Sequence, residues 1–170
     1  NRTIYDVELI DVTGDNATNK IDVTPYTGQS ILRGLGGNDT LIGCVGNDTL
    51  IGGEGDDFLN GGFFTAAWDR AVAQADANLT ATGDANVCYI TGEGTDTVIH
   101  IKQVEPTGGA SNNVLDASGF LGPAFLHGGD GDDTLLGTAF NDTLDGGLGT
   151  DSLVGGDGSD RLWRQGELNF

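Results

Sequence analysis

Two stretches of the chain place one leucine at every ninth position, within surroundings that are otherwise polar and rich in glycine. The first stretch holds three such leucines and the second holds four: Leu41, Leu50, Leu59, Leu135, Leu144, Leu153 and Leu162. Thr or another small residue often precedes the leucine, which favours a short strand that turns one apolar side chain inward. The pattern predicts three-residue strands joined by glycine-rich turns.

The full repeat is nine residues long and can be numbered G1-G2-x3-G4-x5-D6-x7-U8-x9, where U is the leucine position. Its clearest copy spans residues 128–136 and reads GGDGDDTLL. The other copies follow one another without gaps: 34–42, 43–51 and 52–60 in a first array, and 137–145, 146–154 and 155–163 after the clearest copy. Seven copies in two tandem runs indicate a repeat architecture in which neighbouring units share one core.

A longer period of 94 residues relates the two arrays to each other. Residues 21–41 align without gaps on residues 115–135, and the register continues to Gly61-Gly62 over Gly155-Gly156. We therefore expect two tandem units, which a solenoid tolerates well. The first unit, 1–94, has lead-in coils at 1–33, an array at 34–62, and a helical insert and strand at 63–94. The second, 95–170, has a lead-in at 95–127, an array at 128–163 and a tail at 164–170.

The segments outside the arrays predict further strands and one helix. The β-branched runs Thr3–Val7 and Thr97–Ile101 predict strands in the two lead-ins. Between Thr65 and Leu79, apolar residues recur at helical spacing, with Trp68 and Val72 among them, which predicts a short amphipathic helix. We expect this helix to cover an exposed edge or coil of the solenoid, and a partner site is the alternative. The predicted fold class is thus an all-β parallel solenoid with one short helix.

Composition narrows the choice of partners. The chain carries a formal net charge of −19 and contains 30 glycines and no methionine. So large an acidic excess argues against nucleic acid and anionic membrane surfaces as partners, and it favours hard divalent cations. A disordered polyanion is the alternative, but the acidic residues recur in phase with leucine. No apolar stretch approaches the roughly 18 residues of a membrane span, and no signal peptide opens the chain. Lacking methionine, it is expected to be a processed product or a fragment.

The repeat itself carries the chemistry of calcium binding. Its glycines allow positive φ values, so the turn can aim backbone carbonyls at one point, and Asp at position 6 adds a carboxylate. Calcium takes six to eight oxygen ligands of both kinds. Two repeats form a coil of about 18 residues, so aspartates 18 positions apart should stack: Asp39 over Asp57, Asp133 over Asp151, and Asp142 over Asp160.

Stacking of these carboxylates couples calcium binding to folding. Neighbouring strands lie about 4.8 Å apart, and two carboxylates at that distance repel by roughly 3 kcal/mol at an effective dielectric constant near 20. A divalent ion between them turns this repulsion into attraction. One leucine per strand also gives a narrow core, too small to offset the conformational entropy of the chain. We therefore expect the arrays to be disordered without calcium and folded with it.

The arrays resemble the repeats-in-toxin (RTX) family, whose nonapeptides form a right-handed parallel β-roll with calcium between stacked turns. Segments outside the arrays, such as 92–98 (GEGTDTV), resemble the stretches between arrays in large RTX exoproteins more weakly. The resemblance implies about three well-formed calcium sites. It implies carboxylate ligands from Asp39, Asp48, Asp57, Asp133, Asp142, Asp151 and Asp160, and carbonyl ligands from the turns that hold Gly37, Gly55, Gly131 and Gly149.

Three departures from the pattern mark turns where calcium binding is in doubt. The turn at 137–142 has Thr138 at position 2 and Phe140 at position 4, where glycines are expected. The turn at 43–48 has Cys44 at position 2. The pattern also stops after Gly62, which leaves Asp48 without a carboxylate 18 residues later.

The remaining reactive residues point to no catalytic site. The two histidines, His100 and His127, lie in no recognisable catalytic motif, and we expect His127 to be a solvent-facing strand residue. Cys44 and Cys88 leave open a disulfide or, as we expect, two free thiols.

We therefore expect a structural calcium-binding module, without enzymatic activity, of a secreted or cell-surface protein. The resemblance implies type I secretion, with folding on calcium outside the cell. Such a module would suit an S-layer, an adhesin or an extracellular matrix, in contact with further copies of itself or with neighbouring repeat units. The alternative is the C-terminal accessory or secretion domain of an extracellular protease, lipase or epimerase.

Overall fold

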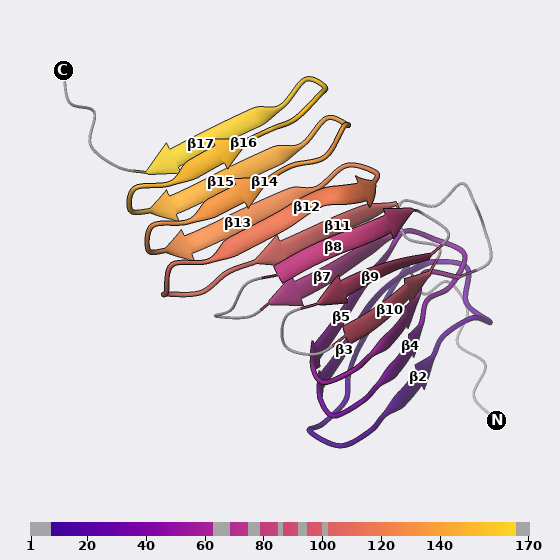
Figure 1. Ribbon diagram of the computed structural model, residues 1–170. Coiled ribbons are helices and arrows are strands. Elements are labelled where there is room, and N and C mark those ends of the chain that lie inside the picture. Colours follow the sequence, from indigo (N-terminus) through magenta and orange to yellow (C-terminus); the bar gives the residue numbers. More distant parts are fainter. Residues whose placement is uncertain are drawn as a thin grey trace.

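Glycine-rich turns interrupt the chain at short intervals, and the segments between them all form strands in the part that the structure describes. The computed structural model describes residues 8–62, 69–74, 79–84, 87–91, 95–99 and 102–165. Its strands build two sheets that the chain visits in turn, so that successive coils stack along one direction (Figure 1). The fold is a parallel β-solenoid, as the nine-residue pattern predicts.

The two sheets, here called sheet A and sheet B, differ in their number of strands. Sheet A has eight parallel strands in the spatial order β1 (Leu9–Thr13), β3 (Gln29–Gly36), β5 (Asp48–Glu54), β7 (Arg70–Gln74), β11 (Gln103–Thr107), β13 (Phe125–Asp130), β15 (Thr143–Leu148) and β17 (Arg161–Gln165). Sheet B has nine in the order β16 (Ser152–Val154), β14 (Thr134–Leu136), β12 (Val114–Leu121), β8 (Leu79–Asp84), β9 (Val87–Thr91), β10 (Thr95–Ile99), β6 (Phe58–Asn60), β4 (Thr40–Ile42) and β2 (Lys20–Asp22).

Both sequence periods appear in the strand registers. Within the arrays, partners lie 18 residues apart, as in the pair Leu32 and Leu50. The coil before each array is two residues longer, because Lys20 pairs with Thr40 and Val114 with Thr134. The 94-residue offset carries β1 onto β11, β4 onto β14 and β6 onto β16 residue for residue. The two parts of the chain thus repeat the same succession of strands.

The core consists of a column of leucines between the two sheets. Five of the predicted inward leucines have no exposed surface: Leu41, Leu50, Leu59, Leu135 and Leu144. Leu153 is only partly buried, and Leu162 is 45% exposed. Leu162 is exposed because β17 is the last strand of sheet A, and no described strand pairs with its outer side. Burial thus follows the stacking of coils, since each leucine needs a neighbour on both sides.

The helix predicted over residues 65–79 is wrong wherever the structure describes this segment. Residues 70–74 form β7, and β8 begins at Leu79. β7 fills the position in sheet A between β5 and β11 and pairs with both in parallel. Ladder hydrogen bonds on two sides, with burial of Ala71 and Val72, outweigh the local helical spacing. Residues 63–68 and 75–78 lie outside the described ranges.

Of the two strands predicted in the lead-ins, one is confirmed in part. β10 covers Thr97 to Ile99 of the predicted strand Thr97–Ile101, and the rest of that strand lies outside the described residues. The predicted strand Thr3–Val7 also lies outside them. Among the described residues of the first lead-in, the first strand is β1, which begins at Leu9.

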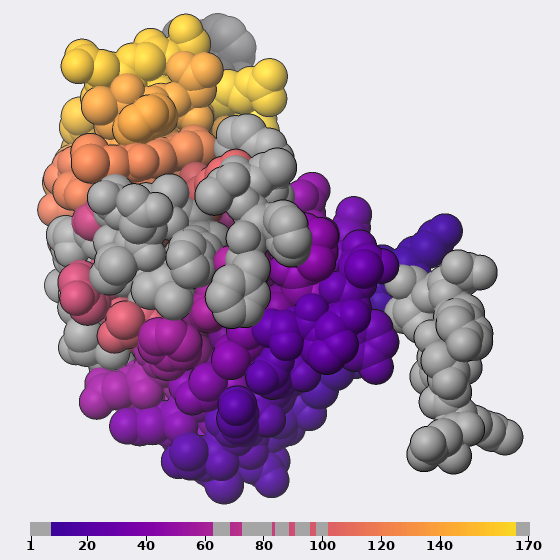
Figure 2. All heavy atoms as spheres, turned by 90° about the vertical axis from the view of Figure 1, so that its right-hand side faces the viewer, coloured from indigo at the N-terminus to yellow at the C-terminus, as the bar shows by residue number. Residues whose placement is uncertain are grey.

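An inserted hairpin makes sheet B wider than sheet A at the middle of the molecule. The strands β9 and β10 pair antiparallel with each other and lie between β6 and β8. Sheet A has no matching insertion, because β7 follows β5 directly and precedes β11. Two extra strands lengthen sheet B by roughly 10 Å. The coils of the first array are accordingly inclined to those of the second (Figure 1), although the coils still stack in sequence order (Figure 2).

One turn of the first array contains a residue in a strained conformation. Leu35 occupies position 2 of its repeat with φ of 87°, and among the described residues it is the only non-glycine with positive φ. Its equivalents Gly53, Gly129 and Gly147 have φ of 107°, 105° and 85°. The turn therefore imposes the left-handed conformation on a residue that has a Cβ atom, which costs about 1–2 kcal/mol.

The free energy of unfolding of the variant Leu35→Gly should exceed that of the wild type by roughly 0.5–1 kcal/mol. The strain that is relieved at this position outweighs the entropic cost of the more flexible glycine. Chemical unfolding at saturating calcium measures the difference. Leu148→Gly is the matched control, since Leu148 lies at position 3 of a turn, is similarly exposed at 55%, and has no positive φ. That control should lose stability, and an equal loss in Leu35→Gly would contradict the assignment of strain.

Candidate metal centre

The position-6 aspartates lie where turns meet strands, and the structure buries most of them. Asp39, Asp57 and Asp133 are 2%, 3% and 1% exposed. Asp48, Asp142 and Asp151 are also buried, whereas Asp160 in the last turn is half-buried. Buried carboxylates need partners. The hydrogen bonds around these side chains therefore decide what each turn can bind.

With the exception of Asp48, each of these carboxylates accepts a hydrogen bond from the backbone of the coil before it. The N–H of Asp39 donates to Oδ1 of Asp57 at 2.8 Å, and the N–H of Asp133 donates to Oδ1 of Asp151 at 3.0 Å. Asp142 and Asp160 are joined in the same way at 3.0 Å. The aspartates thus stack at the 18-residue spacing, in the pairs that the sequence predicts. This leaves Oδ2 of each carboxylate for another partner.

Two further aspartates extend these ladders and were missed by the sequence reasoning. The N–H of Asp48 donates to Oδ1 of Asp69 at 2.9 Å, and the N–H of Asp57 donates to Oδ1 of Asp96 at 3.1 Å. The expectation that Asp48 has no carboxylate stacked on it is therefore wrong, because Asp69 fills this place 21 residues later. Asp96 could have been found, because residues 92–98 match positions 2 to 8 of the repeat. Asp69 follows an insertion of irregular length, so no fixed spacing reveals it.

The turns form two edges of the solenoid, which we call the forward edge and the return edge. At the forward edge the chain passes from sheet A to sheet B, through the turns that end at Asp39, Asp57, Asp133 and Asp151. At the return edge it passes back to sheet A, through the turns that end at Asp48, Asp69, Asp142 and Asp160. The two edges treat their carboxylates differently.

At the forward edge, each aspartate has one buried oxygen without a hydrogen-bond donor. This oxygen is Oδ2 of Asp39, Asp57, Asp133 and Asp151. It lies directly over the position-1 glycine, since a Cβ atom added to Gly34 would stand 2.0 Å from Oδ2 of Asp39. A buried acceptor without a partner costs about 1–3 kcal/mol, and more when it is charged. A bound cation would satisfy these four oxygens.

The backbone of the forward turns is also arranged to offer oxygen ligands. Positions 2 and 4 are left-handed; the glycines expected to contribute carbonyls have φ of 91° (Gly37), 122° (Gly55), 110° (Gly131) and 135° (Gly149). Turns stack so closely that a Cβ atom on Gly149 would lie 1.9 Å from the carbonyl oxygen of Gly131. Carbonyl oxygens of one turn therefore face the next turn. Together with the free carboxylate oxygens they form an all-oxygen donor set, which suits calcium.

The donor set does not suit metals that need several side-chain ligands. Within the described ranges, no three His, Cys, Asp or Glu side chains gather at one point. Any ion at the forward edge would depend on backbone carbonyls for most of its ligands. Calcium accepts such ligands, whereas zinc is bound by several Cys, His, Asp or Glu side chains at once.

At the return edge, Asp48 and Asp142 are fully satisfied by the protein. Oδ2 of Asp48 accepts the N–H of Cys44 at 2.7 Å, and its Oδ1 accepts the hydroxyl of Ser30 at 2.8 Å. Oδ2 of Asp142 accepts the N–H of Thr138 at 2.6 Å and the Thr138 hydroxyl at 3.0 Å. Both carboxylates are predicted calcium ligands, but their Oδ2 atoms already accept hydrogen bonds from the protein. The Oδ2 atoms of the forward-edge aspartates accept none.

Cys44 serves this arrangement as a buried free thiol. Its Sγ lies 3.1 Å from the carbonyl oxygen of Gly28 and 3.2 Å from Oδ1 of Asp48. Burial raises the pKa of the thiol, which keeps it protonated as a donor. Of the two alternatives for the cysteines, Cys44 therefore follows the free-thiol expectation, while the side chain of Cys88 lies outside the described residues.

Burial also raises the pKa of several carboxylates at both edges. The pKa rises to about 6 for Asp57, and to about 7 for Asp69 and for Asp96. In each case burial has the largest effect, and a neighbouring aspartate of the ladder adds repulsion. The pKa of Asp133 is raised by burial and by Asp151. Without a cation, the ladders are therefore sites where protons bind.

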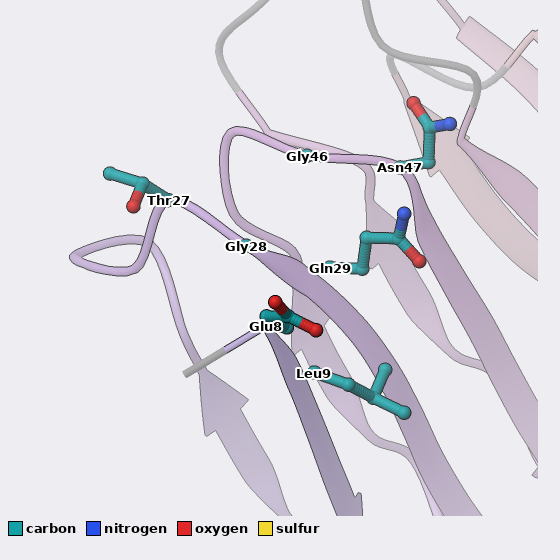
Figure 3. A pocket seen from close by; sticks show the side chains of 7 residues that line it. All are labelled: Glu8, Leu9, Thr27, Gly28, Gln29, Gly46 and Asn47. Atoms are coloured by element: carbon teal, nitrogen blue, oxygen red, sulfur yellow. The ribbon is translucent and has the colours of Figure 1, made fainter. Parts of the chain in front are cut away.

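An open hollow of about 590 Å³ lies at the return edge, near the first strands. It is lined by Glu8, Leu9, Thr27, Gly28, Gln29, Gly46 and Asn47 (Figure 3). Glu8 supplies its one carboxylate, and the hollow lies away from the free oxygens of the forward edge. We assign no ligand to it.

His127 lies on β13 with its side chain 39% exposed and its Nε2 3.8 Å from Oε1 of Glu105. Arg70 lies 2.7 Å from Oε2 of the same glutamate, so these side chains join three neighbouring strands of sheet A. The positions 94 residues earlier hold the ion pair of Arg33 with Asp11. His127 is therefore a cross-strand partner that matches Arg33.

Within the described ranges no helix is long and apolar enough to cross a lipid bilayer.

Comparison with known proteins agrees with this geometry. The pattern that describes four copies of the RTX calcium-binding nonapeptide repeat matches the chain at residues 33–64 and 127–162. No match was found among curated proteins. The matched ranges contain all four forward-edge aspartates with a free buried oxygen. Residues 33–64 and 127–162 are therefore RTX calcium-binding nonapeptide repeats.

Proposed function

We propose that the chain is a structural module that folds when calcium binds between its stacked turns. The observation that carries this proposal is the set of buried Oδ2 atoms without donors at Asp39, Asp57, Asp133 and Asp151. All four belong to turns whose residues at positions 2 and 4 are left-handed and whose carbonyls face the next turn. Calcium would supply the missing positive charge at these oxygens.

The energetics of the coil support coupling between binding and folding. Stacked carboxylates repel by roughly 3 kcal/mol per pair at an effective dielectric constant near 20. The opposing hydrophobic contribution of the arrays is small, because each of their strands adds one leucine to a narrow core. Calcium removes the repulsion and stabilises only the folded chain, so the ion shifts the equilibrium toward the solenoid. In this role the ion is structural.

A fold that depends on calcium suits a protein that functions outside the cell. We propose that the chain is part of a secreted or cell-surface protein. Extracellular calcium modules have dissociation constants of about 10⁻⁴ to 10⁻³ M, well above cytosolic calcium levels. A chain tuned in this way would remain unfolded during export and fold on arrival. The 94-residue repetition of strands supports a structural or adhesive part of that protein, because stacked coils give length.

Circular dichroism should show a large gain of β signal when calcium is added to the metal-free chain, with a midpoint between about 0.1 and 1 mM. Chelator should reverse the change. Magnesium at the same concentration is the control; it requires a tight octahedral site and should leave the signal low. A β signal that persists without calcium would contradict coupled folding, and unchanged spectra with no bound calcium would contradict the proposed function.

Lowering the pH from 8 to 5.5 should stabilise the calcium-free chain. The folded-state pKa values of Asp57, Asp69 and Asp96, about 6, 7 and 7, exceed the ordinary value of 3.8. The folded chain therefore binds more protons than the unfolded chain, and its stability falls as pH rises through about 6 to 7. Because the metal-free chain is largely unfolded at pH 8, circular dichroism of that chain between pH 8 and pH 5.5 measures the change as a gain of β signal. Asp96→Asn should flatten this dependence, and a calcium-free chain that gains stability as pH rises would contradict the assignment.

A further inference from the structure

Four of the turns that the structure describes close on themselves through a hydrogen bond that the turns at 34–39, 52–57, 128–133 and 146–151 lack. In each, the backbone N–H at position 2 donates to the side chain at position 6 of the same turn. The donor and acceptor residues are Asp15 and Asn19 (2.8 Å), Cys44 and Asp48 (2.7 Å), Gly109 and Asn113 (2.9 Å), and Thr138 and Asp142 (2.6 Å). The four turns form two pairs related by the 94-residue offset. The arrangement is therefore a repeated feature of the chain.

The turns at 34–39, 52–57, 128–133 and 146–151 have the opposite arrangement. Their position-2 residue is left-handed, and Oδ2 of their position-6 aspartate has no donor. Among the turns that the structure describes, none combines a left-handed position 2 with the N–H bond of the self-closed turns. In these eight turns, a left-handed φ at position 2 thus occurs with a free carboxylate oxygen, and any other φ occurs with the N–H hydrogen bond.

An N–H group and a cation compete for the same carboxylate oxygen. In the turn at 137–142, Oδ2 of Asp142 already accepts both the N–H and the hydroxyl of Thr138. An ion would have to displace these donors, because their hydrogens carry positive charge. Turning the peptide away requires positive φ at position 2, which is unfavourable for a β-branched residue such as Thr138. The self-closed turn is therefore held in place by its own sequence.

We infer that the backbone conformation at position 2 selects which turns bind calcium, and that the turns at 43–48 and 137–142, whose position 2 is not left-handed, use an N–H group in place of the ion. Calcium then binds along the forward edge, between the turns at 34–39 and 52–57 and between those at 128–133 and 146–151. Asp48 and Asp142 are staples of the return edge, and they make no bond to calcium. This inference rests on the proposed function, since it assigns the ions to particular turns.

A gain of calcium binding tests the inference most directly. The double variant Thr138→Gly/Phe140→Gly restores glycine at positions 2 and 4 of the turn at 137–142. The turn that stacks on it already has left-handed Gly156 and Gly158, with φ of 95° and 118°. The variant should bind one more calcium ion per chain than the wild type, as counted by native mass spectrometry and by calorimetric titration. An unchanged count in the folded variant would overturn the inference.

Two matched single variants provide a second test that does not depend on creating a site. Asp142→Asn should leave the number of bound ions unchanged, because Asn113 already accepts the same N–H bond in the equivalent lead-in turn. Asp133→Asn removes charge from a forward-edge oxygen and should lose one ion or weaken its binding by about tenfold or more. Circular dichroism at saturating calcium checks that both variants are folded.

The outcomes separate the inference from the proposed function. A wild-type chain that binds no calcium at millimolar concentration would sink both. If the wild type binds calcium and Asp142→Asn loses an ion as readily as Asp133→Asn, only the inference fails. If Asp133→Asn alone loses an ion and the double variant gains one, the conformation at position 2 determines which turns bind calcium.

Discussion

The buried carboxylate at position 6 is the constraint on which the rest of the structure depends. One oxygen accepts the backbone N–H of the preceding coil, so each aspartate sets the distance and register between neighbouring coils. The other oxygen lies where the Cβ atom of the position-1 residue would be, so that residue is glycine. The remaining features of the repeat, short strands and a single inward leucine, follow from turns built around this side chain.

The two edges show that one repeat can satisfy its carboxylate in two ways. In the turns at 34–39, 52–57, 128–133 and 146–151, where position 2 is left-handed, Oδ2 of the aspartate stays free for a cation. Where position 2 holds Cys44 or Thr138, the protein supplies the donor. The second solution needs no ion, so the turns at 43–48 and 137–142 contribute order that does not depend on calcium concentration. It also lowers the number of charged oxygens that must be neutralised before the coils can stack.

Much of the fold could be predicted from the sequence because its information is periodic. The nine-residue phase predicts the strands, the inward leucines and the stacking of Asp39 over Asp57. Prediction failed where the period is interrupted. The spacing of Trp68 and Val72 suggests a helix, but the free edges of β5 and β11 recruit this segment as a strand. This strand pairing depends on residues that are distant in sequence, so the local spacing of apolar residues does not predict it.

The candidate sites were predictable to a similar extent. The position-6 aspartates and the unusual turns at Cys44 and Thr138 are visible in the sequence, but the consequence of those substitutions is not. It lies in the direction of one peptide group, which depends on φ at position 2. Asp69 could not be predicted, because a segment of irregular length separates it from Gly61 and Gly62, the glycines that begin its turn. Residues 92–98, by contrast, preserve enough of the repeat to identify Asp96, which joins the ladder from a strand of the inserted hairpin.

The inserted hairpin of β9 and β10 has a mechanical consequence. Because it widens one sheet and leaves the other unchanged, it acts as a wedge between the two arrays. A row of units that each carried such a wedge on the same side would curve into an arc or a spring, whereas uninterrupted coils would build a straight rod. Under tension a curved stack can extend by unbending before any strand pair separates.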